Sequence, residues 1–217
     1  MNGARRKNWQ RILMLAGLFI LVFACGMTSQ AASQKTKAKK AYRTMLAKKY
    51  IYKDGWRMTT KNCDFALAYI DNDSVPELLV YNSDDIPHMG GYGMLYTYSK
   101  GKVKYVTSLA MDEKKTLGYY KQKGILTDAY AQQGYKSEYY IRLKSGKTTS
   151  VLCKEYKYNF RSDKWKLSSY KKLSSGKLKS ASKSSFNKSL KSYVKTRKFT
   201  KFKFYKNTSK NRTKYLK

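Results

Sequence analysis

The sequence predicts an α+β fold: a single domain with a central antiparallel β-meander of about seven to nine strands and helices at both ends. Three patterns predict it. Residues 34–50 carry apolar side chains at helical spacing, and residues 65–173 hold short Tyr-, Val-, Leu- and Thr-rich runs separated by turn residues. Beyond residue 174, a helical stripe and an alternating strand pattern follow. Because no helical pattern separates the central runs, neighbouring strands are expected to pair antiparallel.

The first 32 residues have the three-part pattern of an export signal. Basic residues among the first 11 positions precede an apolar run, residues 12–24, and a small, polar stretch follows. The apolar run is shorter than the roughly 20 residues that a membrane-spanning helix needs. We therefore expect residues 1–32 to be removed and residues 33–217 to form one secreted or cell-surface domain. A lipobox ending at Cys25, which would be lipidated, is the alternative, and the bulky Phe23 argues against it.

The N-terminal helix is expected within residues 33–50, and the meander within residues 62–173. Turn sequences such as Ser145-Gly146-Lys147 separate the strands of the meander. The expected strands are Phe65–Ile70, Glu77–Tyr81, Met94–Tyr98, Val103–Leu109, Ile125–Tyr130, Glu138–Leu143, Ser150–Tyr158 and Trp165–Tyr170.

The C-terminal segment, residues 174–217, predicts a helix, a strand and a second helix. Ser184 or Ser185 is suited to cap the first helix. Phe199–Tyr205 alternates aromatic and lysine side chains, as a strand with one buried face does. From Asn207 onward a short helix is expected, ending in solvent. The apolar face of the first helix is formed by Phe186, Leu190, Tyr193 and Val194.

Charge is distributed unevenly along the chain. The 47 basic and 13 acidic residues give a formal charge of +34, and about +30 remains for residues 33–217. Residues 62–99 contain no Lys or Arg but hold six of the acidic residues and the single histidine, His88. Residues 164–217 contain 19 Lys or Arg and no acidic residue. The acidic island is therefore expected to be either a counter-charge for the basic segment or a cation site.

One stretch of the acidic island, AYIDNDSVPELLV from Ala68 to Val80, places three carboxylates between two apolar runs. Asp, Asn and Ser favour turns because their side chains hydrogen-bond to nearby backbone groups, so a plain hairpin turn is the favoured interpretation. A weak calcium site and a catalytic carboxylate cluster are the alternatives. The metal ligands would be Asp71, Asp73 and Glu77, completed by Asp64, Asp84 or Asp85. No other cofactor is predicted.

The same stretch resembles the D-x-[DN]-x-D-G-x-P-E-L hairpins of secreted Gram-positive proteins and FG-GAP-like and dockerin-like calcium loops. Asp71 and Asp73 match the third and fifth loop positions, whereas Tyr69, Ser74 and Val80 stand where the first Asp, the turn Gly and the closing Glu are found. The order of helix, hairpin and Gly-rich loop also resembles small exported proteins of Gram-positive gut anaerobes. The resemblance implies calcium binding through the loop and no particular activity.

Cys63 and Cys153 form an even pair in a chain expected to be exported. A disulfide between them would close a loop of about 90 residues and contribute about 4–5 kcal/mol in the chain-entropy model. Two buried free thiols are the alternative.

The remaining motifs predict little chemistry. A single histidine, His88, excludes zinc sites that need several histidines. The tyrosine pairs at residues 119–120 and 139–140 place one ring on each face of a strand, so core packing is favoured over a stacking platform.

The composition favours an exported, non-catalytic cell-envelope protein that anionic wall polymers hold by electrostatics. Lysine greatly outnumbers arginine, and lysine provides point charges rather than the planar fork used in specific recognition. No sequence-specific nucleic-acid recognition is therefore expected. The alternatives are an extracellular hydrolase using Asp71, Asp73 or Glu77, and a nonspecific extracellular nucleic-acid binder.

Overall fold

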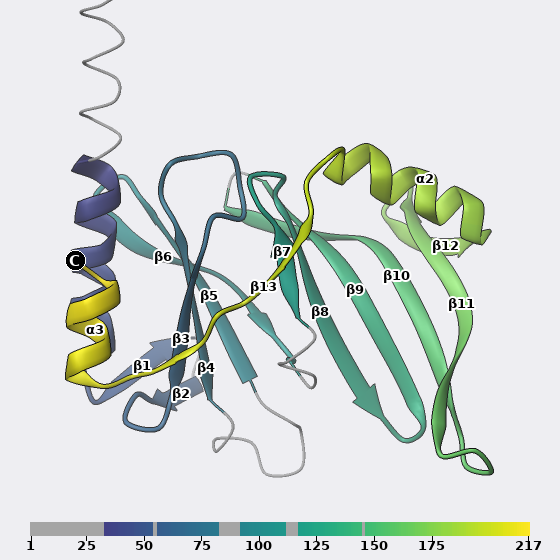
Figure 1. Ribbon diagram of the computed structural model, residues 1–217, viewed down its shortest axis with the longest axis horizontal. Helices are drawn as coiled ribbons and strands as arrows, with labels where there is room; N and C mark the ends of the chain where they lie inside the picture. Colours follow the sequence, from purple (N-terminus) through teal and green to yellow (C-terminus); the bar gives the residue numbers. More distant parts are fainter. Residues whose placement is uncertain (1–32, 54–55, 83–91, 112–116, 145) are drawn as a thin grey trace, which may run out of the picture.

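The computed structural model describes residues 33–53, 56–82, 92–111, 117–144 and 146–217 (Figure 1). Within these ranges the chain forms three helices and 14 strands, and every strand pairing is antiparallel. The predicted α+β class is confirmed. The predicted export signal and Cys25 lie outside the described residues, as do Asp84, Asp85 and His88. None of the helices described is long and apolar enough to cross a membrane.

A five-stranded sheet follows the N-terminal helix, which covers residues 33–46. Its strand order is β14-β3-β4-β5-β6, so four consecutive strands form a meander and a strand from the C-terminus joins the free edge of β3. The strands are β3 (Asp64–Ala68), β4 (Glu77–Asn82), β5 (Tyr92–Ser99), β6 (Lys102–Leu109) and β14 (Tyr205–Lys206).

A seven-stranded sheet continues the meander in the order β12-β11-β10-β9-β8-β7-β13. Here too the C-terminal segment returns, and β13 joins the edge at β7. The strands are β7 (Gly118–Tyr120), β8 (Ile125–Gln132), β9 (Tyr135–Lys144), β10 (Lys147–Asn159), β11 (Lys164–Ser174), β12 (Lys177–Ala181) and β13 (Phe199–Lys201).

All eight strands expected from the sequence are present, as β3–β6 and β8–β11. Strand β7 was not predicted, because three residues are too few to show an alternation. A small hairpin of β1 (Tyr50–Lys53) and β2 (Trp56–Thr59) was also missed, and it ends the N-terminal helix at residue 46 rather than 50.

The five-stranded sheet is buried on both faces. All six residues of β4 are buried, and they alternate between two cores. Leu78 and Val80 pack with Tyr42 and other residues of the N-terminal helix, whereas Leu79 and Tyr81 pack against the seven-stranded sheet. The domain is therefore layered as helix, sheet, sheet and helix; in Figure 1 the N-terminal helix and the five-stranded sheet lie on the left, and the last helix lies at the upper right above strands of the seven-stranded sheet.

The last layer is helix α2 (Lys183–Val194), which covers the outer face of the seven-stranded sheet. Phe186 is fully buried there against Tyr140 and Tyr170. The apolar face predicted for this helix is confirmed, but its N-cap is Ser182 rather than Ser184 or Ser185. The cap falls earlier because the Ser182 side chain accepts the Ser185 N–H at 3.1 Å.

The segment Phe199–Tyr205 is not one strand, which corrects the prediction. It contributes β13 to one sheet and β14 to the other, and it crosses between them in Figure 1. At the crossing, Phe202 stacks on Tyr119 with ring centroids 5.3 Å apart, and Phe204 packs at 5.8 Å on Tyr81. The predicted alternation of aromatic and lysine side chains is present. Phe202 and Phe204 face the space between the two sheets.

Helix α3 (Ser209–Tyr215) does not end in solvent as expected, because Leu216 is buried in the core beside the N-terminal helix. The Asn207 amide donates to the carbonyls of Leu46 and Thr60 at 3.0 and 2.8 Å. These contacts fasten the end of the chain to its beginning.

Replacing Leu79 with alanine should lower the free energy of unfolding by about 2–5 kcal/mol, because it opens a cavity between the sheets. Leu167→Ala is the matched control: this side chain is 37% exposed and its truncation should cost less than about 1 kcal/mol. Urea denaturation measures both, and equal losses would contradict the layered core.

Candidate functional site

The structure brings together the three carboxylates predicted as a site. Asp71 and Asp73 lie in the loop between β3 and β4, and Glu77 is the first residue of β4. Each offers an oxygen that lies within 4.8 Å of the others. The loop and the start of β4 therefore bring the three carboxylate groups close together.

The loop is also the hairpin turn that the sequence predicts. Asp71 Oδ1 accepts the Asp73 N–H at 3.0 Å, and Asp73 Oδ1 accepts the Val75 N–H at 2.7 Å. Glu77 Oε2 accepts the Ile70 N–H at 2.9 Å, closing the base of the loop. Each carboxylate thus satisfies one backbone donor with one oxygen.

Glu77 is the most constrained of the three carboxylates. Its side chain is fully buried, and Oε1 has no hydrogen-bond partner among the described atoms. Burial raises the pKa of Glu77 to about 8, and the neighbouring charges of Asp71 and Asp73 add to this rise. The hydrogen bond from Ile70 acts in the opposite direction and is outweighed. Because Oε1 of Glu77 is buried without a hydrogen-bond partner, its negative charge must be neutralised by a proton or a cation.

The loop is held rigidly between two other elements. On one side the Tyr42 hydroxyl of the N-terminal helix donates to the Pro76 carbonyl at 3.0 Å. On the other side the Gln122 N–H donates to the Tyr69 carbonyl at 2.9 Å, and the Gly124 N–H donates to the next carbonyl. Gly124 has φ of 66°, and a Cβ there would lie 2.6 Å from a backbone oxygen of the β9 end, so the close approach needs glycine.

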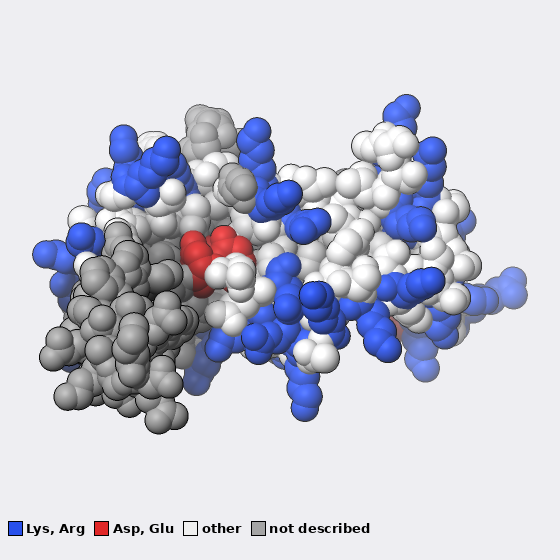
Figure 2. Space-filling view, turned by 90° about the horizontal axis from the view of Figure 1, so that it is seen from above, with Lys and Arg blue, Asp and Glu red and all other residues white. Residues whose placement is uncertain are grey.

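Several basic side chains lie around the loop. Two cavities of about 380 and 490 Å³ lie beside it, and Asp71 and Asp73 line both. Within the described part of the chain, no ion pair joins these carboxylates to Lys or Arg. Figure 2 shows an acidic patch between grey and white atoms, with basic side chains nearby on the same face. The basic lining residues are Lys104 and Lys147 in the first cavity, and Lys123, Arg142 and Lys144 in the second.

Not every predicted ligand joins the cluster. Asp64 pairs with Tyr81 at one end of the β3–β4 hairpin, whereas Glu77 pairs with Ala68 at the other end. Four residues of strand separate the two ends, which is about 13 Å. Asp64 therefore does not complete the cluster.

Glu77 lines neither of the two cavities beside the loop, so its carboxyl is poorly placed to contact a substrate.

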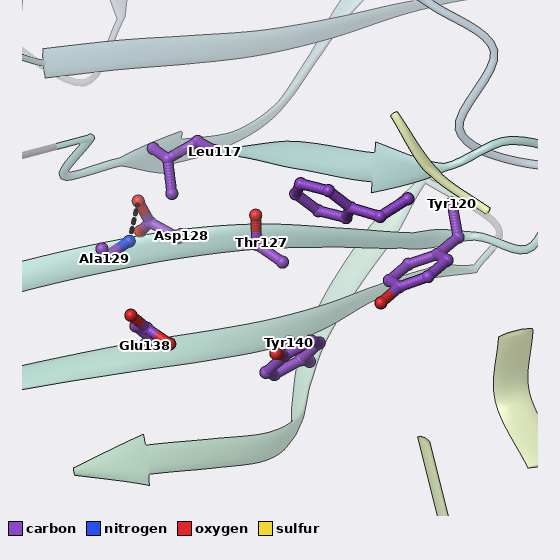
Figure 3. A pocket seen from close by; sticks show the side chains of 8 residues that line it. Leu117, Tyr120, Thr127, Asp128, Ala129, Glu138 and Tyr140 are labelled. Carbon is purple, nitrogen blue, oxygen red and sulfur yellow. Dashed lines mark hydrogen bonds between the residues drawn. The ribbon is translucent and has the colours of Figure 1, made fainter. Parts of the chain in front are cut away.

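A second candidate site is a cavity of about 310 Å³ on the seven-stranded sheet, which was not predicted from the sequence (Figure 3). Its tyrosines, Tyr120 and Tyr140, lie toward one end, and two carboxylates, Asp128 and Glu138, lie toward the other. The two tyrosines come from the adjacent pairs at 119–120 and 139–140. As predicted, each pair sends one ring to each face of the sheet, and all four rings pack in or against a core.

Internal donors already occupy both carboxylates of this cavity. Asp128 accepts the backbone N–H groups of Ala110, Met111 and Ala129 at 3.0–3.1 Å. Glu138 accepts from the Tyr156 hydroxyl and pairs with Lys136 and Lys154. These acids are therefore structural, and the cavity does not offer a free acid–base pair. Their isolated positions in β-strand sequence carry no signal that would have identified them.

The two cysteines of the fold are free and buried. Cys63 lies beside the edge of the five-stranded sheet, where its thiol donates to the Thr60 carbonyl at 3.1 Å, whereas Cys153 is in β10 of the other sheet. The disulfide alternative is thus not realised, and burial raises the pKa of the Cys63 thiol to about 12 and that of Cys153 to about 11. Thiols of this kind are unreactive.

Comparison with known proteins assigns no family. No protein-family model matches the chain, and no curated protein matches it. Among solved structures, the chain is similar to a Xanthomonas protein described as related to a type IV secretion system, at 16% sequence identity and a TM-score of 0.41. The match covers 54% of this chain and 57% of that chain, a little over half of each.

Removing the ionisable group with Glu77→Gln should change how stability depends on pH. In metal-free buffer the folded state holds a proton on Glu77 up to about pH 8, whereas the unfolded state releases it near its ordinary pKa of 4.5. The folded state then binds more protons, so this carboxyl makes stability fall as pH rises from 4.5 to 8, at up to about 1.4 kcal/mol for each pH unit.

Urea denaturation at several pH values measures this slope. The slope should flatten in Glu77→Gln and persist in Asp163→Asn, which changes an exposed acid at the far end of the domain. A wild-type slope that survives in Glu77→Gln would show that Glu77 is charged in the fold.

Proposed function

We propose that the protein is an exported, non-catalytic component of the cell envelope, held there by anionic polymers bound to its lysine-rich surface. The supporting observation is the solvent exposure of the basic segment. Of its 19 Lys and Arg side chains, 16 are exposed, and the other three are half-buried. Among the described residues, no ion pair joins Asp71, Asp73 or Glu77 of the acidic island to this segment.

The chemistry of the surface supports charge binding rather than sequence or shape recognition. Most of its cations are lysines, which are mobile, hydrated point charges. They are spread over α2, β12 and the segment after α2, and Figure 2 shows them over much of one face. A polymer with a regular phosphate or carboxylate repeat would contact many of them at once, and salt would weaken every contact.

Neutralising three exposed lysines, with Lys177→Gln, Lys179→Gln and Lys183→Gln combined, should weaken binding to purified wall polymer. At about 1 kcal/mol for each lysine that contacts an anionic surface, the affinity falls about fivefold if one of the three makes contact and about 150-fold if all three do. The control changes the same positions to arginine, which keeps the charge and should keep the binding. Retention on wall polymer across a salt gradient measures both.

Elution of the wild-type protein by 0.5 M NaCl is part of the same expectation. A protein that stays on the polymer at this concentration would contradict charge-based retention. Competition between teichoic acid and DNA separates the envelope from the nucleic-acid alternative, because a preference for DNA at equal phosphate concentration would favour the latter.

A second candidate property is a divalent-cation site in the β3–β4 loop, for which the unpartnered Glu77 Oε1 is the specific observation. Asp71, Asp73 and Glu77 would hold the ion through carboxylate oxygens, the ligand type that calcium prefers. Glu77 keeps Oε1 free after its backbone hydrogen bond from Ile70 is counted. Such an ion would stabilise the junction of the two sheets rather than perform chemistry.

Calcium should raise the melting temperature of the wild-type protein, because it would bind only the native state. At a concentration 100-fold above Kd the gain is about 2.7 kcal/mol, or about 5–10 °C for a domain of this size. Asp71→Asn and Asp73→Asn should abolish the shift, and Asp163→Asn should keep it. No shift at 10 mM calcium would exclude the site.

A further inference from the structure

An exposed aromatic cluster lies at the far end of the seven-stranded sheet. Phe160, in the turn between β10 and β11, is 83% exposed, and Tyr135, next to the turn between β8 and β9, is 62% exposed. Trp165 and Leu167 on β11 are each 37% exposed. Figure 1 shows the β10–β11 hairpin projecting beyond the rest of the domain. Large apolar side chains gathered at a projecting tip are typical of interaction sites.

A hydrogen bond joins the end of β10 to the β8–β9 turn and holds the cluster together. The Tyr158 N–H donates to the Gly134 carbonyl at 2.9 Å, which joins β10 to the β8–β9 turn. Tyr158 packs edge-on against both Phe160 and Trp165, with ring centroids 5.1 Å apart in each case. The exposed rings are therefore held in place by a hydrogen-bonded scaffold and are not loose side chains on a loop.

One face of the hairpin carries Tyr158 and Trp165, and the opposite, basic face also carries Tyr135 of the neighbouring strand. Cross-strand partners point to the same side of a sheet, so Tyr158 and Trp165 share one face. Lys157 pairs with Lys166 on β11 and with Tyr135 on β9, so these three share the opposite face. Lys157 also lies over the Tyr135 ring, at 5.9 Å from its centroid. The exposed basic residues of the tip are Lys157, Arg161, Lys164 and Lys166.

This combination fits the surface of an anionic lipid bilayer. Trp and Tyr prefer the interface between headgroups and acyl chains, where one end of the ring is apolar and the other is hydrated. Phe gains most from the acyl region, and lysine stems reach back so that the charges stay among the headgroups. Polybasic segments next to such aromatic anchors are attracted to anionic lipids.

We propose that the β10–β11 tip docks on anionic membrane lipid, with Phe160 as its deepest anchor and the surrounding lysines on the headgroups. A single-stranded nucleic acid is a poorer match, because its bases need rings arranged along a groove, whereas Phe160 is 83% exposed and begins the turn at the end of a projecting hairpin. The proposal goes beyond polymer binding, since it names a lipid partner and depends on apolar contact by Phe160 as well as on charge.

The test compares Phe160→Ser with a matched control, Tyr52→Ser, which removes an exposed aromatic (68% exposed) from β1. The unit used is residues 33–217, which contains every residue of the three core clusters and lacks the apolar run at 12–24. Co-sedimentation is measured at 0.1 M NaCl with vesicles of phosphatidylcholine, with and without 30% phosphatidylglycerol. A short oligothymidylate and wall polymer are tested in parallel.

Wild-type protein and Tyr52→Ser should bind only the vesicles that contain phosphatidylglycerol. Phe160→Ser should bind them about tenfold more weakly, and Phe160→Leu should restore most of the binding. All variants should melt at the wild-type temperature and bind wall polymer equally, so failure here is distinguishable from failure of the envelope proposal. The proposal is overturned by equal vesicle binding in Phe160→Ser and wild type, by no binding at all, or by a Phe160 effect confined to oligothymidylate.

Discussion

The structure depends on one constraint: strand β4 is buried on both of its faces. A sheet with two apolar faces must be covered twice, and the N-terminal helix supplies one cover while the seven-stranded sheet supplies the other. The C-terminal segment then joins both layers, adding β13 to one sheet and β14 to the other. The order of the four layers follows from this requirement.

The same constraint creates the local chemistry of the acidic loop. Glu77 begins a strand that has no solvent-facing side, so its carboxyl is enclosed although the loop before it is exposed. The hydrogen bond from Ile70 satisfies one oxygen and leaves the other without a partner. The burial that stabilises the sheet thereby produces the most perturbed carboxyl of the cluster, and the two aspartates keep that oxygen's surroundings negative.

Burial of apolar and aromatic groups also leaves the cations outside. Tyrosines fill the two sheet faces with their rings, and long lysine side chains cover the outer surface. At the β10–β11 tip several exposed rings and lysines occur together, because the hairpin extends past the layers that would cover it. The broad cationic surface and the aromatic tip share Lys164 and Lys166, and the tip differs from the rest of that surface by its exposed rings.

The sequence by itself determined the local structure: the helical stripes, the eight strands and the turn at Asp71–Ser74 follow from short-range periodicity and turn chemistry. It also brought Asp71, Asp73 and Glu77 together, because they lie within seven residues of one hairpin. Only the tertiary structure decided that Phe199–Tyr205 divides between two sheets, that Cys63 and Cys153 stay apart, and that Phe160 remains uncovered. These outcomes depend on which layers meet, and contacts between distant segments leave no periodic signal in the chain.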